Sequence, residues 1–199
     1  MKLISGHEKE QFIVTMQDAF LEDPLYRFLS DDLAVRKKVI RIIFDMITNN
    51  DYGTQYINNK IPNAGAVWLH LGPKGHKSLI KSIQLQLRLI LSGCIQRFVD
   101  MNKPFQKMEA KQKELYQSSD AYLSLLFVSP DFQNQGIASL LLTPELERFD
   151  RENLICSLDT FNQRNIPFYE KFGFKLVSEI HFNEHLTNYQ MQRRPRSNA

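Results

Sequence analysis

The sequence predicts a mixed α/β (α+β) fold, and three observations carry this prediction. Two nearly continuous apolar runs, "AYLSLLFVS" (121–129) and "LICSLDTF" (154–161), are typical of strands that are buried on both faces. A helix-forming segment over about 136–151 joins them, and this order places the two strands parallel and adjacent. The chain has 199 residues, 43% of them hydrophobic, with no repeat or long linker, so we expect one domain over 1–199.

The N-terminal half combines amphipathic helices with a strand pair. Apolar residues recur at helical spacing over 7–21 and 33–48, and Pro24 ends or redirects the first helix. "DYGTQYIN" and "AGAVWLHL" predict two strands divided by the turn-prone "NNKIPN". Residues 77–99 alternate in part like a strand. Their apolar positions also share one helical face, and they are rich in helix formers, which favours a helix.

The remaining segments follow the same patterns. "NKPFQKMEAKQKELYQ" predicts a polar helix after a break at Pro104, and "QRNIPFYEKF" predicts a short helix. "GFKLVSEIHF" and "HLTNYQMQ" predict a closing strand pair. Pro144 lies inside the helix of 136–151 and removes a backbone bond to Leu140, so we expect a kink there.

Composition limits the classes of function. A formal net charge of +3 suits an anionic ligand without implying nucleic acid, and we interpret the basic tail "QRRPRSNA" as a solvated terminus. Cys94 and Cys156 lack the spacing of a zinc site or a disulfide scaffold, so we expect two buried thiols and no metal. No apolar run reaches membrane-spanning length and no signal core follows the N-terminus, which predicts a cytoplasmic protein without a membrane partner.

The stretch "QNQGIASLL" (133–141) combines small residues with the expected start of a helix. The first N–H groups of a helix have no intrahelical partner and lie at the positive end of its dipole. Gly136 and Ala138 leave room for an anion to reach these groups, and Ser139 adds a hydroxyl donor. The segment is therefore a candidate phosphate site. The alternative is a turn glycine that opens an ordinary amphipathic helix.

Two motifs, "FVSPDFQNQGIASLLL" and "NQRNIPFYEKFGF", together resemble the GNAT superfamily of acetyl-CoA-dependent N-acetyltransferases. Several residues match the phosphate motif Gln/Arg-x-x-Gly-x-Gly/Ala, the Val-x-Pro before it, and the downstream Asn, Tyr and Glu-Lys-x-Gly-Phe. They are Val128, Pro130, Gln133, Gly136, Ala138, Asn162, Tyr169, Glu170, Lys171, Gly173 and Phe174. Weaker similarity elsewhere points to the puromycin N-acetyltransferase-like branch.

The resemblance implies the GNAT fold, a central mixed, mostly antiparallel twisted sheet with one splayed parallel strand pair and flanking helices. It implies an acceptor-side half over about 1–118 and an acetyl-CoA-binding core over about 119–183. Acetyl-CoA would be the cosubstrate, and no metal would be needed. The expected cofactor-binding residues are Phe127, Val128, Gln133, Gln135, Gly136, Ile137, Ala138, Ser139, Asn162 and Asn165.

The same resemblance implies how these residues act. Main-chain groups of Phe127 and Val128 would pair with the pantetheine arm like an added strand. The loop before the helix would hold the pyrophosphate, and an N–H such as that of Val128 would stabilise the oxyanion. Tyr169 would give a proton to the departing sulfur. Asn165 stands where many members have Ala, so it could face the cofactor or cap a helix.

The predicted activity is transfer of an acetyl group from acetyl-CoA to a primary amine of a small molecule. Alternatives are a protein or peptide N-acetyltransferase and a non-catalytic module that binds coenzyme A. No nucleic-acid partner is expected, and the protein would be a monomer or homodimer. The general base that neutralises the amine stays open among four candidates, Glu22, Asp23, His70 and Asp120.

Overall fold

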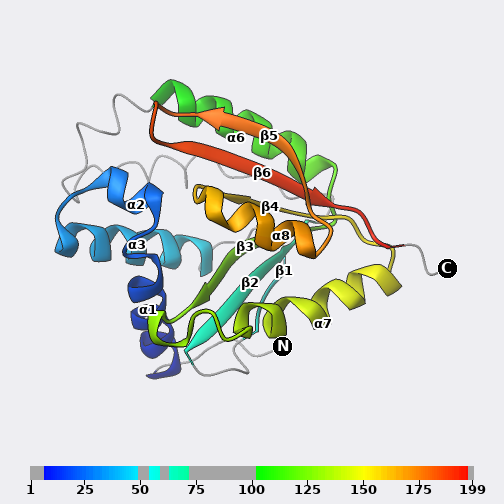
Figure 1. The fold of residues 1–199 in the computed structure, drawn as a ribbon, viewed down its shortest axis with the longest axis horizontal. Coiled ribbons are helices and arrows are strands. Elements are labelled where there is room, and N and C mark those ends of the chain that lie inside the picture. The colour runs from blue at the N-terminus through cyan, green and yellow to red at the C-terminus, as the bar shows by residue number, and fades with distance from the viewer. Residues whose placement is uncertain (1–6, 49–53, 59–62, 72–101, 197–199) are drawn as a thin grey trace.

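A computed structural model describes residues 7–48, 54–58, 63–71 and 102–196 (Figure 1). The helix predicted over 77–99 and Cys94 lie outside these residues. The helices are α1 (His7–Phe20), α2 (Pro24–Leu29), α3 (Leu33–Thr48), α6 (Asn102–Gln117), α7 (Ile137–Arg151) and α8 (Ile166–Lys171). The strands are β1 (Thr54–Asn58), β2 (Ala64–His70), β3 (Ala121–Val128), β4 (Cys156–Thr160), β5 (Lys175–His181) and β6 (Thr187–Arg193). Short 3-10 turns, Pro130–Phe132 and Gln163–Asn165, precede α7 and α8.

The strands form one sheet in the order β1-β2-β3-β4-β6-β5. Among the strands that the structure describes, only β3 and β4 pair in parallel, and the other four pairings are antiparallel. The fold prediction is therefore confirmed: the sheet is mixed and mostly antiparallel, its parallel pair is the one predicted from the two apolar runs, and helices flank it. Each of the other predicted helices and strands is present, displaced by a few residues at most.

The parallel pair separates halfway along β3. Its register runs from Ala121 opposite Cys156 to Leu123 opposite Leu158, and no pairing with β4 continues beyond that point. On its other edge, β3 stays paired with β2 as far as Val128 opposite Ala64, with an irregularity next to Leu123 and Leu125. A bulge bends a strand and increases its twist. The outer half of β3 thus turns away from β4 and leaves a splayed edge (Figure 1).

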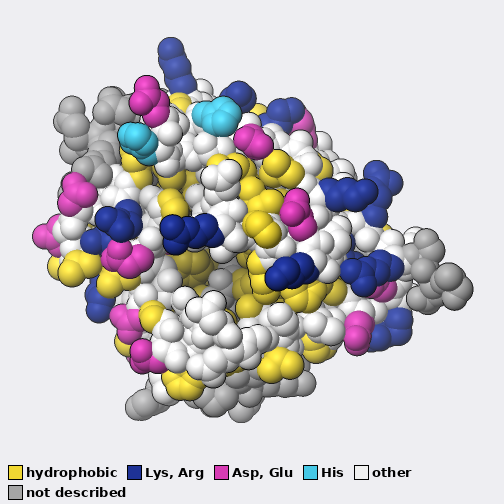
Figure 2. Space-filling model, viewed as in Figure 1, with side chains coloured by type: hydrophobic (Ala, Val, Ile, Leu, Met, Phe, Trp, Pro, Cys, Tyr) yellow, Lys and Arg dark blue, Asp and Glu magenta, His cyan; other side chains and the backbone are white. Residues whose placement is uncertain are grey.

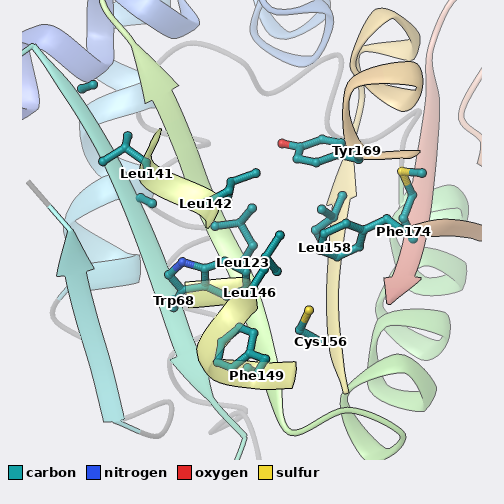
Figure 3. Close-up of a cluster of buried hydrophobic side chains, with 14 of the residues drawn as sticks. Trp68, Leu123, Leu141, Leu142, Leu146, Phe149, Cys156, Leu158, Tyr169 and Phe174 are labelled. Carbon is teal, nitrogen blue, oxygen red and sulfur yellow. The ribbon is translucent and has the colours of Figure 1, made fainter. Parts of the chain in front are cut away.

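Helices pack on both faces of the sheet. On one face α7 and α8 cover a core that includes Trp68, Leu123, Leu158 and Met191, and Figure 3 shows part of it. On the other face α1, α2 and α3 cover a core with Val67 and Phe127, while Leu115 of α6 packs on Leu69 and Tyr122. Successive residues of a strand alternate between these two faces. The interpretation of Trp68 as a core residue is confirmed, and Cys156 is buried as expected.

Two local predictions need correction. Helix α6 begins at Asn102 and contains Pro104 in its first turn, where proline is tolerated because the missing N–H would have had no intrahelical partner. Arg193 is not part of a solvated tail. It is the last residue of β6, only 2% exposed, and its guanidinium pairs with Asp150 at 2.6 Å and donates to the Phe172 carbonyl at 2.8 Å. Helix α7 continues through Pro144 as a single helix.

Candidate active site

The start of α7 leaves main-chain donors open. Gly136 occupies the N-cap position with φ of +78°, a left-handed conformation that side chains rarely adopt, and it offers no side-chain cap. The first intrahelical bond runs from Leu140 N–H to the Gly136 carbonyl. The N–H groups of Ile137, Ala138 and Ser139 therefore face outward at the positive end of a 15-residue helix. A Cβ atom on Gly136 would meet nothing within 4 Å, so the approach to these groups is open.

The loop between β3 and α7 is held by its own polar groups. Gln133 Nε2 donates to the Val128 carbonyl at 3.1 Å, and Gln135 Nε2 donates to the Asp131 carbonyl at 3.3 Å. Asn134 adopts a left-handed conformation with φ of 61°. Gln133 thus anchors the loop to the end of β3, a structural role for its amide that the sequence motif does not reveal.

The splayed edge of β3 exposes particular main-chain groups. Ser129 N–H donates to the Asn63 carbonyl at 2.8 Å, and Phe127 lies opposite Gly65, so these residues direct their main-chain groups towards β2. By the alternation of a strand, Leu126 and Val128 direct theirs towards β4, where pairing has stopped. Sequence reasoning missed Leu126, because the direction of a main-chain group depends on register. The side chain of Phe127 packs edge-on against Phe12 in the core.

Tyr169 lies at the gap where β3 and β4 separate, which we call the opening. Its ring is 7% exposed and packs against Phe168 and Phe174. Figure 3 shows the ring leaving α8 near Leu158, with the hydroxyl oxygen directed into the space between β3 and β4. Burial first, and then the charges of Asp159 and Asp23, raise the pKa of Tyr169 well above its ordinary value. The phenol is therefore protonated throughout the neutral range.

The two predicted asparagines stabilise the turn that leads into α8. Asn162 Oδ1 accepts from Arg164 N–H at 3.1 Å and caps the 3-10 turn. Asn165 Nδ2 donates to Thr160 Oγ1 at 3.2 Å and makes no capping bond at the start of α8. Both side chains thus fix the connection between β4 and the helix that carries Tyr169.

Among the four candidate bases, Asp23 is the one whose charge contributes to the raised pKa of Tyr169. Asp120 accepts from Ile155 N–H at 2.8 Å beside the start of β3, and Glu22 pairs with Arg27 and Arg36 at the surface. The pKa of His70, at the end of β2, is lowered by burial and by the nearby Arg148. Asp23 instead caps α2, where its Oδ1 accepts from Leu25 N–H at 3.0 Å. Burial raises the pKa of Asp23 to about 6, with a smaller contribution from Asp159.

Space-filling representation shows a depression at this part of the molecule (Figure 2). In the common view of Figures 1 and 2 it lies between α3, β3 and α8, with hydrophobic side chains in its depth and basic side chains at its rim. The depression thus lies along the open edge of β3 and beside α8, the helix that carries Tyr169.

Residues 110–195 match the family model described as an acetyltransferase (GNAT) domain. Over residues 110–195, this chain thus matches a GNAT acetyltransferase domain. The crystal structure of PH1933 from Pyrococcus horikoshii OT3 is similar over 98% of this chain and 96% of that one, with 14% sequence identity and a TM-score of 0.55, which supports the fold.

Other similar structures match only part of this chain. The ribosomal-protein-S18-alanine N-acetyltransferase from Escherichia coli is 24% identical over 40% of this chain and 56% of its own, with a TM-score of 0.35. Ard1 from Thermoplasma volcanium is 23% identical over 39% of this chain and 55% of its own, with a TM-score of 0.34. This chain thus spans little more than half the length of these two proteins.

Within the GNAT domain, the described residues contain no group of three or more His, Cys, Asp or Glu side chains that could hold a metal ion, and the same is true of the other described segments. The helices of the described ranges include none that is long and apolar enough to span a membrane. The assignment to the puromycin N-acetyltransferase-like branch stays a prediction.

Proposed function

We propose that this protein transfers the acetyl group of acetyl-CoA to a primary amine of a small molecule. The observation that carries the proposal is the opening between β3 and β4, where open main-chain groups of one strand, an uncapped helix start and a protonated tyrosine lie together. We also propose that residues 1–199 act as one domain, with the acceptor side formed mainly by 1–118.

In this proposal the pyrophosphate of acetyl-CoA binds the N–H groups of Ile137, Ala138 and Ser139. The pantetheine arm pairs with the splayed edge of β3 through the main-chain groups of Leu126. The thioester then lies in the gap between the strands, where the Val128 N–H is placed to stabilise the oxyanion that forms on attack.

Tyr169 acts as the general acid in this proposal. When the C–S bond breaks, the phenol gives its proton to the departing sulfur. Its raised pKa means that the phenol still carries its proton when the C–S bond breaks, and that it is a weaker acid than an exposed tyrosine. Asn162 and Asn165 contribute by holding the turn that positions α8.

Thiol release tests this function directly. Purified protein is incubated with acetyl-CoA and a panel of small primary amines and short peptides, and free coenzyme A is measured. Turnover with small amines supports the proposal. Turnover with peptides alone would indicate a peptide N-acetyltransferase, and tight acetyl-CoA binding without any turnover would indicate a binding module.

A further inference from the structure

A strip of polar side chains crosses the buried sheet surface beside the opening. It consists of Ser157 and Asp159 of β4 and Asn188 and Gln190 of β6, which alternation places on the face that carries α1–α3 and α6. We call these four residues the polar strip. Ser157, Asn188 and Gln190 are each at most 1% exposed. Apolar side chains would be the ordinary choice for such positions.

Several polar atoms of the polar strip have no hydrogen-bond partner among the described residues. Asn188 Nδ2 donates to Asp159 Oδ2 at 2.6 Å, and Gln190 lies directly opposite Asp159 in the ladder. Among the residues the structure describes, however, Ser157 Oγ, Asn188 Oδ1 and Gln190 Nε2 have no hydrogen-bond partner. Buried polar atoms without partners are costly in a folded protein, so Asn188 Oδ1 and Gln190 Nε2 on neighbouring positions of β6 indicate a ligand that satisfies them.

Helix α2, whose N-cap is Asp23, packs beside the polar strip. Tyr26 and Leu29 of this helix share one core cluster with Phe161, which follows β4, and Leu186, which precedes β6. Burial first, and then the charges of Asp23 and Asp159, raise the pKa values of Tyr26 and Tyr169, so both phenols are neutral at physiological pH. Oδ1 of Asp23 accepts from Leu25 N–H, and among the described contacts Oδ2 accepts none. Two carboxylates near two neutral phenols favour a cation between them.

The geometry points to the acceptor itself: a small cationic amine whose ammonium binds between Asp23 and Asp159, with an adjacent hydroxyl or amide that bonds Asn188 Oδ1 and Gln190 Nε2. This inference rests on the proposed acetyl transfer and adds the class of acceptor. Gln190 Nε2 needs an acceptor and Asn188 Oδ1 needs a donor, and an amide or a hydroxyl supplies both. A carboxylate next to the ammonium would be repelled by the two acidic side chains.

The position of Asp23 also makes this residue the general base that neutralises the amine in our proposal. Asp23 takes one proton from the ammonium, and the freed lone pair forms the N–C bond with the thioester carbon, which gives the oxyanion. The C–S bond breaks when this oxyanion returns to a carbonyl. Tyr169 gives its proton to the sulfur and regains one from the acylated nitrogen, while Asp23 releases its proton to solvent. The sum is amide, free thiol and one proton from ammonium and thioester.

The test compares four amines of similar size: glycinamide, ethanolamine, n-propylamine and glycine. We expect kcat/KM to be highest for glycinamide or ethanolamine, lower for n-propylamine and lowest for glycine. Asp159→Asn should raise KM for the three cationic amines roughly 10- to 100-fold and reduce the discrimination against glycine. Gln190→Met should lower the preference for glycinamide over n-propylamine about 3- to 10-fold with little change for n-propylamine.

Gln192→Met is the matched control for Gln190→Met. Gln192 lies on the same strand and face, but its amide already bonds Ser118 and Ser119. The Gln192→Met variant should leave the order of kcat/KM among the four amines unchanged. Thermal melting of each variant verifies folding, and Asp159→Glu should restore part of the activity if Asp159→Asn unfolds.

The outcomes separate the two proposals. If no amine or peptide is acetylated, the proposed function fails. If small amines are acetylated but glycine or n-propylamine is used as well as glycinamide, or Gln190→Met leaves the preference intact, acetyl transfer stands and the acceptor inference is overturned. Turnover with peptides alone overturns it as well.

Discussion

The opening between β3 and β4 has two sides that are built in different ways: a donor side, which we propose binds acetyl-CoA, and an acceptor side, which we propose binds the amine. On the donor side, main-chain groups of β3 and α7 are left open, and the side chains nearby are small or are used to hold the loop. On the acceptor side, partly buried carboxylates and buried amide and phenol side chains come from α2, β4 and β6, three segments far apart in the sequence. Open main-chain groups suit a ligand that many proteins share. Polar side chains from several elements suit a ligand that this protein selects.

The largest expected effect concerns the acceptor side. If Asp23 is the base, Asp23→Asn should lower kcat by about 10²- to 10⁴-fold. The pKa of about 6 also predicts that kcat/KM of the wild type falls as pH drops through 6, because the carboxylate gains a proton. A pH profile from 5 to 9 measures both effects, and Glu22→Gln at the neighbouring surface position is the control. An unchanged acidic limb in Asp23→Asn would assign the base elsewhere.

On the donor side, Tyr169→Phe should have the next largest effect. The substitution keeps the ring and its packing on Phe168 and Phe174 but removes the proton, so kcat should fall roughly 10- to 1,000-fold. Acetyl-CoA affinity and melting temperature should barely change, which calorimetry and thermal melting would verify. Full turnover in stable Tyr169→Phe protein would leave solvent as the proton source.

A smaller effect is expected at the helix start. Gly136→Asn keeps a residue that tolerates the left-handed conformation but places a side chain where phosphate oxygens approach, so acetyl-CoA should bind roughly 10- to 100-fold more weakly. Gly173→Asn is the control, because Gly173 has a similar φ of +89° and lies at the end of α8. Equal acetyl-CoA affinity in both variants would argue against the phosphate site.

The smallest effect is on stability, and it has the opposite sign to the effect on activity. Because folding raises the pKa of Asp23, the folded state binds more protons between Asp23's ordinary value and about 6, and stability falls as pH rises through that window. Asparagine caps a helix equally well and carries no charge. Urea unfolding should therefore find Asp23→Asn close to wild type at pH 4 but about 1–3 kcal/mol more stable at pH 7.5. Equal differences at both pH values would contradict this.

The donor side could be predicted from the sequence because its residues are contiguous. Gly136 and the apolar run after it indicate a helix start, and the two buried runs fix the parallel pair. The direction of main-chain groups along β3 could not be predicted, because it depends on the register with β2. The sequence therefore predicts that Phe127 pairs with the pantetheine arm, whereas Leu126 faces the open edge.

The acceptor side was largely beyond the sequence. Ser157 and Asp159 alternate with apolar residues along β4, and Asn188 and Gln190 alternate along β6. This alternation is a signal, but partially exposed strands show the same pattern. The sequence leaves Asp23 as one of four candidates for the general base, because only the fold shows that α2 lies close to β4 and α8. Side chains from separate elements acquire a common function only through tertiary packing, and no local spacing encodes that.

Amide hydrogen exchange with and without acetyl-CoA tests the donor site most directly. The main-chain groups assigned to the cofactor should become protected when it binds, namely the N–H groups of Leu126 and Val128 on β3 and of Ile137, Ala138 and Ser139 at the start of α7. Phe127 N–H, which faces β2, should change little. Binding of acetyl-CoA that leaves all five amides unprotected would contradict the proposed site.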